Sequence, residues 1–237
     1  HKEVMITYKQ EDMPQSVGVV DFEKGRMDKS TPYSWLTDDT ISAGTWTTTG
    51  SWSYTEELNI KTSKEIIHTL IDIVSKNGQL LLNISPKANG VIPQAQRESL
   101  LGVGKWLRAN GEAIYNTRPF RLFGDAVYGE GPKRLKSSGH FVEMDGAYNQ
   151  ENIRFTTNGS TLYAIQMGWP GSHKKLLISS LSKEKRGDIQ VTNVSVVDSS
   201  EKIHWQLTDQ GLEIISPFEA SNKVAISYKI ETNNAFN

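Results

Sequence analysis

Three consecutive segments in the middle of this 237-residue chain restrict its fold more than any other feature. A T-x-x-E capping box at Thr62 begins a helix, and Asn77-Gly78 ends it with a left-handed turn signal. The run LLLNI at 80–84 is apolar on both faces, as in a parallel strand that helices cover on both sides. Pro93 then begins a second helix, which Asn110-Gly111 ends. This order predicts part of an α/β barrel or of a doubly wound sheet.

The pattern changes after about residue 117, where helical spacing gives way to short strands. IRFTT and TLYAIQM flank Asn158-Gly159, which predicts a hairpin with a two-residue turn. Further short strands follow at roughly even spacing, as in an antiparallel β-sandwich. We therefore expect two domains, an α/β domain over 1–118 and an all-β sandwich over 119–237.

The region before the capping box contains shorter elements. VMITYK (4–9) and VGVV (17–20) predict buried strands, whereas 28–61 is polar and aromatic without a clean period and predicts a long irregular loop. The first strand begins within a few residues of His1. We therefore expect that an N-terminal part of the α/β domain is missing from this chain.

Composition argues against several classes of function. The formal net charge of -1 provides no field that would attract nucleic acid or an acidic membrane. No run approaches the roughly 20 apolar residues of a membrane span. The chain has no cysteine, so disulfides and thiolate metal sites are excluded, and its histidines show no ligand spacing. We predict no metal or other cofactor, no nucleic-acid partner and no membrane partner.

The stretch VGVVDFEKGR (17–26) places two carboxylates at the end of an apolar strand. Side chains alternate along a strand, so Asp21 and Glu23 point to one face and Phe22 to the other. A carboxyl group at the carboxyl end of a barrel strand is suited to acid/base chemistry. The alternative is a solvated turn in which both acids only face water.

Four motifs between 62 and 119 occur in a specific order: VSKNG, LLLNI, PKANG and NGEAIY. This order closely resembles the C-terminal part of the catalytic barrel in α-L-fucosidases of glycoside hydrolase family 29. Upstream, ITYK, VGVVDFEKG, WLTDDTIS and SWSYTE resemble the corresponding segments of bacterial members. The resemblance implies that 1–118 is the C-terminal portion of a TIM-like (β/α)8 barrel and that 119–237 is the family's C-terminal β-sandwich.

The resemblance also implies roles for individual residues. It places the family's acid/base near VGVVDFEKGR, where we prefer Glu23 because its longer side chain reaches further and bacterial relatives share D-x-E-[RK]-G. Asp21 is the alternative acid/base. Lys9 corresponds to an Arg or Lys that approaches the sugar in relatives, although a solvated strand-end lysine is equally consistent. Three aromatic residues are candidates for stacking on the apolar face of fucose, with packing as the alternative: Trp35, Trp46 and Trp52.

Two functions follow from the resemblance. The first is an α-L-fucosidase that removes terminal α-L-fucose from glycans or glycoconjugates with net retention. Family members carry the nucleophilic Asp on an earlier strand, so a missing N-terminal segment or another chain would supply it. The second is a truncated, non-catalytic remnant that binds carbohydrate or mediates assembly. In both cases an incomplete barrel exposes strand edges and an apolar interior, which predicts self-association or pairing with a complementing N-terminal fragment.

Overall fold

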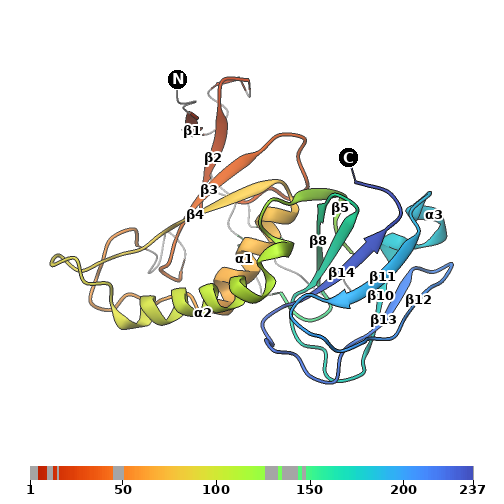
Figure 1. Ribbon diagram of the computed structural model, residues 1–237. Coiled ribbons are helices and arrows are strands. Elements are labelled where there is room, and N and C mark those ends of the chain that lie inside the picture. Colours follow the sequence, from red (N-terminus) through yellow and green to blue (C-terminus); the bar gives the residue numbers. More distant parts are fainter. Residues whose placement is uncertain are drawn as a thin grey trace. The chain divides into compact units, whose positions relative to one another are not determined.

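The computed structural model divides into two compact units (Figure 1). One unit comprises His1–Lys105 with Pro132–Gly146, and the other Trp106–Gly131 with Ala147–Asn237. The predicted domain boundary between 118 and 119 stays a prediction. The structure describes residues 5–9, 13–14, 16–44, 51–125, 133–134, 144–145 and 148–236.

A parallel sheet forms the N-terminal unit, with its strands in the order β1-β2-β3-β4. Their bounds are β1 (Thr7–Lys9), β2 (Val19–Glu23), β3 (Trp35–Thr40) and β4 (Gly78–Asn83). All three neighbouring pairs are parallel, so the carboxyl ends of the strands lie along one edge of the sheet. Among the described residues the sheet is an open row of four strands, and it does not close into the expected barrel.

Strand β3 lies in the segment that the sequence predicted to be irregular, and that prediction was wrong for residues 35–40. Trp35 and Thr37 are buried, whereas Leu36 and Asp38 on the other face are half-buried. The period of two is therefore present, but threonine and aspartate occupy positions where apolar residues are usual. The Thr37 hydroxyl donates a hydrogen bond to the Phe22 carbonyl over 2.7 Å, so this buried polar group has a partner.

Helix α1 (Ser63–Ser75) covers one face of this sheet. Both bonds of the predicted capping box are present at its N-terminus, and Asn77 after its C-terminus has a φ of 73°. Ile73 of α1 is in the same core cluster as Tyr8, Val20 and Trp35, with Phe22 and Leu80 packed against it. Leu81 points to the other face and is 56% exposed, so helices do not cover β4 on both sides within the described residues.

Helix α2 (Gln94–Asn110) follows, and the 3-10 helix η1 (Gly111–Ala113) continues it. Trp106 is fully buried and donates from Nε1 to the Ala225 carbonyl over 3.0 Å. Leu101 of the same helix is 57% exposed. None of the helices in the described ranges is long and apolar enough to cross a membrane.

The C-terminal unit contains the expected antiparallel sandwich. One sheet has the order β11-β14-β9-β8-β5 and the other β10-β13-β12, and side chains from both form one apolar core. The strands of the first sheet are β5 (Arg118–Asp125), β8 (Ile153–Asn158), β9 (Thr161–Gln166), β11 (Val191–Val196) and β14 (Ile226–Thr232). Those of the second are β10 (Lys175–Ile178), β12 (Trp205–Leu207) and β13 (Leu212–Ile215). Two short helices, η2 (Ser179–Leu181) and α3 (Lys183–Arg186), follow β10. The paired strands β6 (Lys133–Arg134) and β7 (Met144–Asp145) belong to the N-terminal unit, where they form a separate two-stranded sheet.

The hairpin between β8 and β9 is present, but its turn lies one residue later than predicted. Asn158 pairs with Thr161, so the two turn residues are Gly159 and Ser160. Gly159 has a φ of 56°, and a Cβ added there would meet nothing within 4 Å. The left-handed position thus coincides with the glycine, where it carries no steric cost.

Candidate active site

One ammonium group joins three strands on the sheet face opposite α1. The Lys9 Nζ lies 2.8 Å from Asp21 Oδ2 and 2.5 Å from Asp38 Oδ1. Asp21 Oδ1 also accepts a hydrogen bond from the Asp38 backbone N–H over 3.2 Å. This cluster connects the carboxyl-terminal halves of β1, β2 and β3 and is hereafter called the Lys9 cluster.

The two carboxylates of the Lys9 cluster share a single cation. Burial raises the pKa of the Asp21 carboxyl above 3.8, and the hydrogen bond from Lys9, which acts to lower it, does not offset this effect. The charge of Asp38 raises the pKa of Asp21 further. Burial acts to lower the pKa of Lys9, but its hydrogen bonds to both carboxylates outweigh that effect and raise it above 10.5. Lys9 therefore stays charged, and the cluster favours a proton on Asp21 more than an isolated aspartate would.

Glu23 is the last residue of β2 and lies on the same face as Asp21, two residues closer to the edge of the sheet. It is half-buried, and within the described part of the chain no hydrogen bond or ion pair involves its carboxylate. Phe22 points to the opposite face, where its ring meets Trp35 edge-on with centroids 6.0 Å apart. The alternation predicted from the sequence is thus present.

The chain turns sharply immediately after Glu23. Lys24 has a φ of 51°, in the left-handed region that a lysine rarely adopts, and the buried Gly25 follows. Two contacts hold Lys24 in this conformation: its N–H donates to the Asp38 carbonyl over 2.8 Å, and its Nζ lies 5.4 Å from the ring centroid of Trp52. Such a conformation persists only where surrounding contacts fix it, so the end of β2 is a defined structure.

The candidate tryptophans have different positions. Trp52 is half-buried, and its carbonyl accepts hydrogen bonds from Asn83 Nδ2 (2.9 Å) and Ser85 Oγ (3.2 Å), which place it at the carboxyl end of β4. Trp35 is fully buried on the α1 side of the sheet, and its Nε1 donates to the Lys76 carbonyl over 2.9 Å. Its ring has no exposed face on which a sugar could stack, which corresponds to the packing alternative. Trp46 lies outside the described residues.

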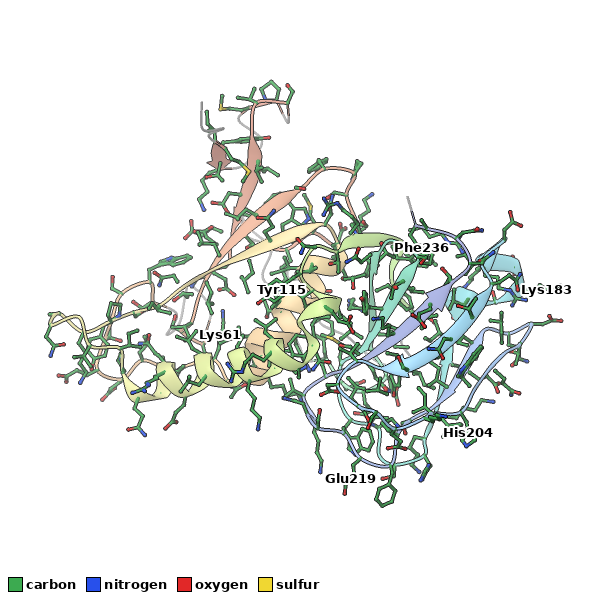
Figure 2. All side chains as sticks on the ribbon, in the orientation of Figure 1. Lys61, Tyr115, Lys183, His204, Glu219 and Phe236 are labelled. Atoms are coloured by element: carbon green, nitrogen blue, oxygen red, sulfur yellow. The ribbon has the colours of Figure 1, made fainter. Side chains whose placement is uncertain are left out.

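Two further charged groups lie near the same edge. Lys61 (Figure 2) donates to Asp39 Oδ2 over 2.6 Å and to the Thr40 carbonyl over 2.8 Å. Burial lowers the pKa of Lys61 below 10.5, although attraction to Asp39 opposes this. Arg26 lies 3.7 Å from the fully buried Asp72 of α1, so the segment after β2 also contacts the helix behind the sheet.

Sequence reasoning missed Asp38, which contributes a carboxylate to the Lys9 cluster. It lies in the segment that was predicted to be irregular, so no strand was available to place it beside Asp21. The alternation of Trp35 and Thr37 with Leu36 and Asp38 is the signal that could have found it. Within the described residues, no group of three or more His, Cys, Asp or Glu side chains could hold a metal ion.

The cluster and Glu23 together form a polar patch at the carboxyl ends of parallel strands, where α/β folds place their ligands. Comparisons with known proteins identify the family of the chain. The family model described as "Alpha-L-fucosidase" matches residues 1–112, and that described as "Alpha-L-fucosidase C-terminal domain" matches 147–231. The chain belongs to the α-L-fucosidase family. The predicted resemblance to glycoside hydrolase family 29 is confirmed.

Individual α-L-fucosidases match over most of this chain but only part of their own length. The tissue α-L-fucosidase of Rattus norvegicus is 30% identical over 181 residues, covering 75% of this chain and 33% of that protein. The plasma α-L-fucosidase of Rattus norvegicus is 42% identical over 158 residues, covering 65% and 29%. This chain therefore spans about a third of the length of the curated relatives that it matches.

Solved α-L-fucosidase structures share the fold. One structure of an α-L-fucosidase aligns with a TM-score of 0.70 at 24% identity, over 91% of this chain and 42% of that chain. The Thermotoga maritima α-fucosidase aligns with a TM-score of 0.66 at 24% identity, over 91% and 45%. At this identity the likeness concerns the fold, which includes the C-terminal β domain.

Proposed function

We propose that this chain contributes the acid/base side of a retaining α-L-fucosidase active site, and that its α/β unit is the C-terminal portion of a (β/α)8-type barrel. The substrate is a terminal α-L-fucose on an oligosaccharide or glycoconjugate. The observation that carries this proposal is the position of Glu23: a carboxyl group without a partner in the described residues, at the carboxyl end of a parallel strand, beside the Lys9 cluster. Family membership supports the choice of substrate.

In the proposed mechanism Glu23 acts twice. As an acid it donates its proton to the glycosidic oxygen while a second carboxylate attacks the anomeric carbon and forms a fucosyl-enzyme intermediate. As a base it then removes a proton from the water that hydrolyses this intermediate, and it regains the acid form. Each of the two displacements inverts the anomeric carbon, so the product keeps the configuration of the substrate, and the net reaction consumes only water.

Access to substrate favours Glu23 over Asp21 as this acid. Asp21 has a raised pKa, which suits an acid, but it is 7% exposed and both of its oxygens are bound, to Lys9 and to the Asp38 N–H. A general acid must first reach the oxygen that it protonates, and only then does its pKa matter. Glu23 lies at the rim of the sheet and has no competing bond within the described part of the chain, so it meets the geometric condition.

The nucleophile requires a carboxylate about 5–5.5 Å from the acid. Asp21 and Asp38 are the described carboxylates beside Glu23 on this face, and both are bound to Lys9, which reduces their nucleophilicity. We therefore propose that a segment outside the present sequence, or a second chain, supplies the nucleophile. This matches the expectation from the family resemblance.

Lys9 and Trp52 are the proposed sugar-binding residues. An ammonium group has three N–H donors, and Asp21 and Asp38 use two of them, so the third can donate to a fucose hydroxyl. The Trp52 ring is half-buried, with Lys24 Nζ near one face. Its other face is suited to the C–H groups of the sugar.

Complementation by another segment also fits the exposed apolar side chains of the N-terminal unit. Met5 and Ile6, just before the edge strand β1, are 66% and 55% exposed, and Leu81 on the open sheet face is 56% exposed. Exposed apolar groups beside the open edge of a sheet favour pairing with further strands. Light scattering should therefore show self-association of the isolated chain, and a cleanly monomeric chain that unfolds cooperatively would contradict this part of the proposal.

Two substrates test the role of Glu23: an aryl α-L-fucoside and a natural fucosyl disaccharide, each assayed with the chain alone and with an added N-terminal fragment. Glu23→Gln should lower kcat on the disaccharide by about 10²–10⁴-fold, because its leaving alcohol needs the proton. The loss on the aryl fucoside should be smaller, because an activated leaving group needs little protonation. Asp21→Asn should retain more activity than Glu23→Gln, and the exposed Glu57→Gln serves as the matched control. Full activity of Glu23→Gln on the disaccharide would contradict the assignment.

A further inference from the structure

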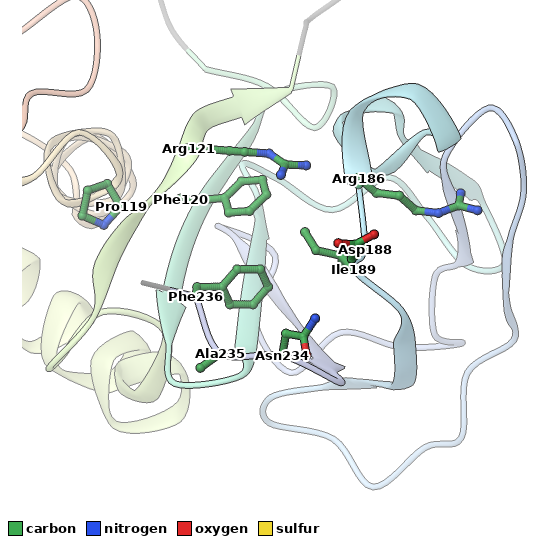
Figure 3. Close-up of a pocket in the computed structure, with 10 residues that line it drawn as sticks. Pro119, Phe120, Arg121, Arg186, Asp188, Ile189, Asn234, Ala235 and Phe236 are labelled. Atoms are coloured by element: carbon green, nitrogen blue, oxygen red, sulfur yellow. The ribbon is translucent and has the colours of Figure 1, made fainter.

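A pocket lies within the C-terminal unit, built from segments that are distant in the sequence (Figure 3). Its walls come from the start of β5 (119–121), the end of α3 with the loop that follows it (186–189), and the segment after β14 (234–236). Its volume is about 310 Å³. Ligand sites of proteins begin at about 300 Å³, so this pocket is large enough for a small ligand.

Two phenyl rings form the apolar side of the pocket. Phe120 and Phe236 meet edge to face, with centroids 5.5 Å apart at an interplanar angle of 89°. Phe120 is buried at 4% exposure, whereas Phe236 is half-buried and packs against the sandwich core. The Phe236 N–H donates to the Gly159 carbonyl over 2.8 Å, which fixes the backbone that carries the ring. The pocket therefore has a rigid aromatic surface that is only partly covered by protein.

The two arginines of the pocket are already bound. Arg121 donates to the Lys185 carbonyl, and its guanidinium lies 5.0 Å from the Phe120 ring centroid. Arg186 donates to the Thr208 carbonyl over 2.8 Å, and Figure 3 shows its side chain extending away from the two rings. Backbone carbonyls are neutral, so both guanidinium groups keep their positive charge, but these hydrogen bonds hold the two groups in place, and Asp188 offsets one of the two charges.

Two planar polar groups remain available on the other sides of the pocket. Asp188 and Asn234 are exposed, and no hydrogen bond within the described residues involves the carboxylate of the first or the side-chain amide of the second. Figure 3 shows Asp188 on the opposite side of the pocket from Phe120 and Phe236. Gly187 next to it leaves open space, since a Cβ there would meet nothing within 4 Å.

The chemistry of a pyranose matches a half-covered aromatic ring opposite a carboxylate and an amide that have no hydrogen-bond partner among the described residues. One face of the sugar carries C–H groups that pack on an aromatic ring, and its edges carry hydroxyl pairs that bind carboxylate and amide groups in a bidentate manner. We propose that this pocket is an accessory binding site for a neutral carbohydrate. Phe236 packs against the sugar ring, and Asp188 and Asn234 bind adjacent hydroxyls.

NMR titration of the isotopically labelled full chain tests this proposal. The probes are N-acetyllactosamine, lactose and maltose, which are neutral disaccharides without fucose, so the outcome does not depend on hydrolysis. At least one of them should shift the amide signals of Gly187, Ile189 and Asn234 in a saturable manner. Inorganic sulfate serves as the charged comparison and should leave these signals unchanged.

Variants assign the interaction to individual groups. Asp188→Ala and Asn234→Ala change exposed side chains, so both should fold, and each should weaken binding by at least about tenfold, which corresponds to about 1.4 kcal/mol. Phe236→Ala should abolish the shifts, while Phe218→Ala should leave them intact. Phe218 is 60% exposed, and its neighbour Glu219 lies on the far side of the unit from Phe236 (Figure 2).

Three results would overturn the proposal: no saturable shift with any of the three disaccharides, shifts with sulfate alone, or unchanged affinity in both Asp188→Ala and Asn234→Ala. The NMR titration measures binding at 187–189 and 234, whereas the Glu23 assay measures hydrolysis. A negative result in one experiment therefore leaves the other proposal standing. Equally, a chain that does not hydrolyse fucosides can still bind these sugars in this pocket.

Discussion

Gly78 lies so close to the Trp35 ring that any larger side chain at position 78 would collide with it, and the structure shows how much stability this collision should cost. Gly78 begins β4 directly opposite Trp35 of β3, and a Cβ added to it would lie 2.4 Å from Cζ2 of the indole and 2.5 Å from Cε2. Real Cβ contacts essentially never fall below 3.0 Å, so something must move. Trp35 is fully buried and held by its bond to the Lys76 carbonyl, so the ring cannot turn aside freely.

Gly78→Ala should therefore destabilise the N-terminal unit. Overpacking a filled core costs about 1–3 kcal/mol. The φ of Gly78 is outside the left-handed region, so the alanine itself is unstrained and reduces the entropy of the unfolded chain by about 0.4–1 kcal/mol. The net expectation is a loss of about 1–2 kcal/mol in the free energy of unfolding, measured by guanidinium denaturation followed by circular dichroism.

A double-mutant cycle separates this contact from other effects of the alanine. Trp35→Phe removes the ring atoms that the new Cβ would meet, so Gly78→Ala should cost less in the Trp35→Phe background by about 1 kcal/mol or more. Strictly additive effects, or a Gly78→Ala protein as stable as its parent, would refute the reasoning. Either result would also mean that the Trp35 ring is not confined in the core, and sugar stacking would again be an open role for Trp35.

Three further predictions concern charge and helix capping. Lys9→Met removes the hydrogen bond that lowers the pKa of Asp21, so that pKa should rise further in an NMR titration. The raised pKa of Asp21 in the folded protein contributes stability that is fully present below pH 3.8 and is lost as the pH rises through the folded-state pKa. Lys9→Met should therefore destabilise the protein more at neutral pH than at acid pH. Thr62→Ala should cost about 1 kcal/mol in denaturant unfolding, because it removes the helix cap, and an unchanged midpoint would contradict this. Burial first, then the charge of Glu112, raises the pKa of Tyr163 to about 12, and burial also raises the pKa of Tyr228, so ultraviolet titration should show late phenolates of which Tyr163→Phe eliminates the one near 12. The stability that Tyr163 contributes should be full below pH 10.0 and lost as the pH rises through about 12.

Local signals predicted most of the regular elements. The capping box at Thr62, the left-handed Asn77 and the helix beginning after Pro93 depend on neighbouring residues alone, and all three are present. The hairpin at 158–161 was found for the same reason, although its turn is Gly159-Ser160 because the strand pairing continues through Asn158.

Elements whose stability comes from distant contacts could not be predicted in this way. Strand β3 has few apolar residues, and it exists because it pairs on both sides, with β2 and β4. Leu101 has helical spacing but is 57% exposed, because periodicity shows which residues share a face and not whether another element covers that face. The same limit applies to Leu81, which lies in an apolar run but on an open sheet face.

The two acids of DFEKG illustrate what a strand pattern can and cannot determine. Alternation correctly placed Asp21 and Glu23 on one face, but it does not show how deeply each side chain is buried or which groups it binds. Asp21, one pleat further from the edge, is within reach of Lys9 and is bound and buried, whereas Glu23 lies at the rim, where the left-handed Lys24 ends the strand. The strand order brings Lys9 and Asp38 to either side of Asp21, and neither the order nor the register is encoded locally. One lysine thus holds two carboxylates, and the third has no partner among the described residues. This difference is the physical basis for proposing Glu23 as the proton donor.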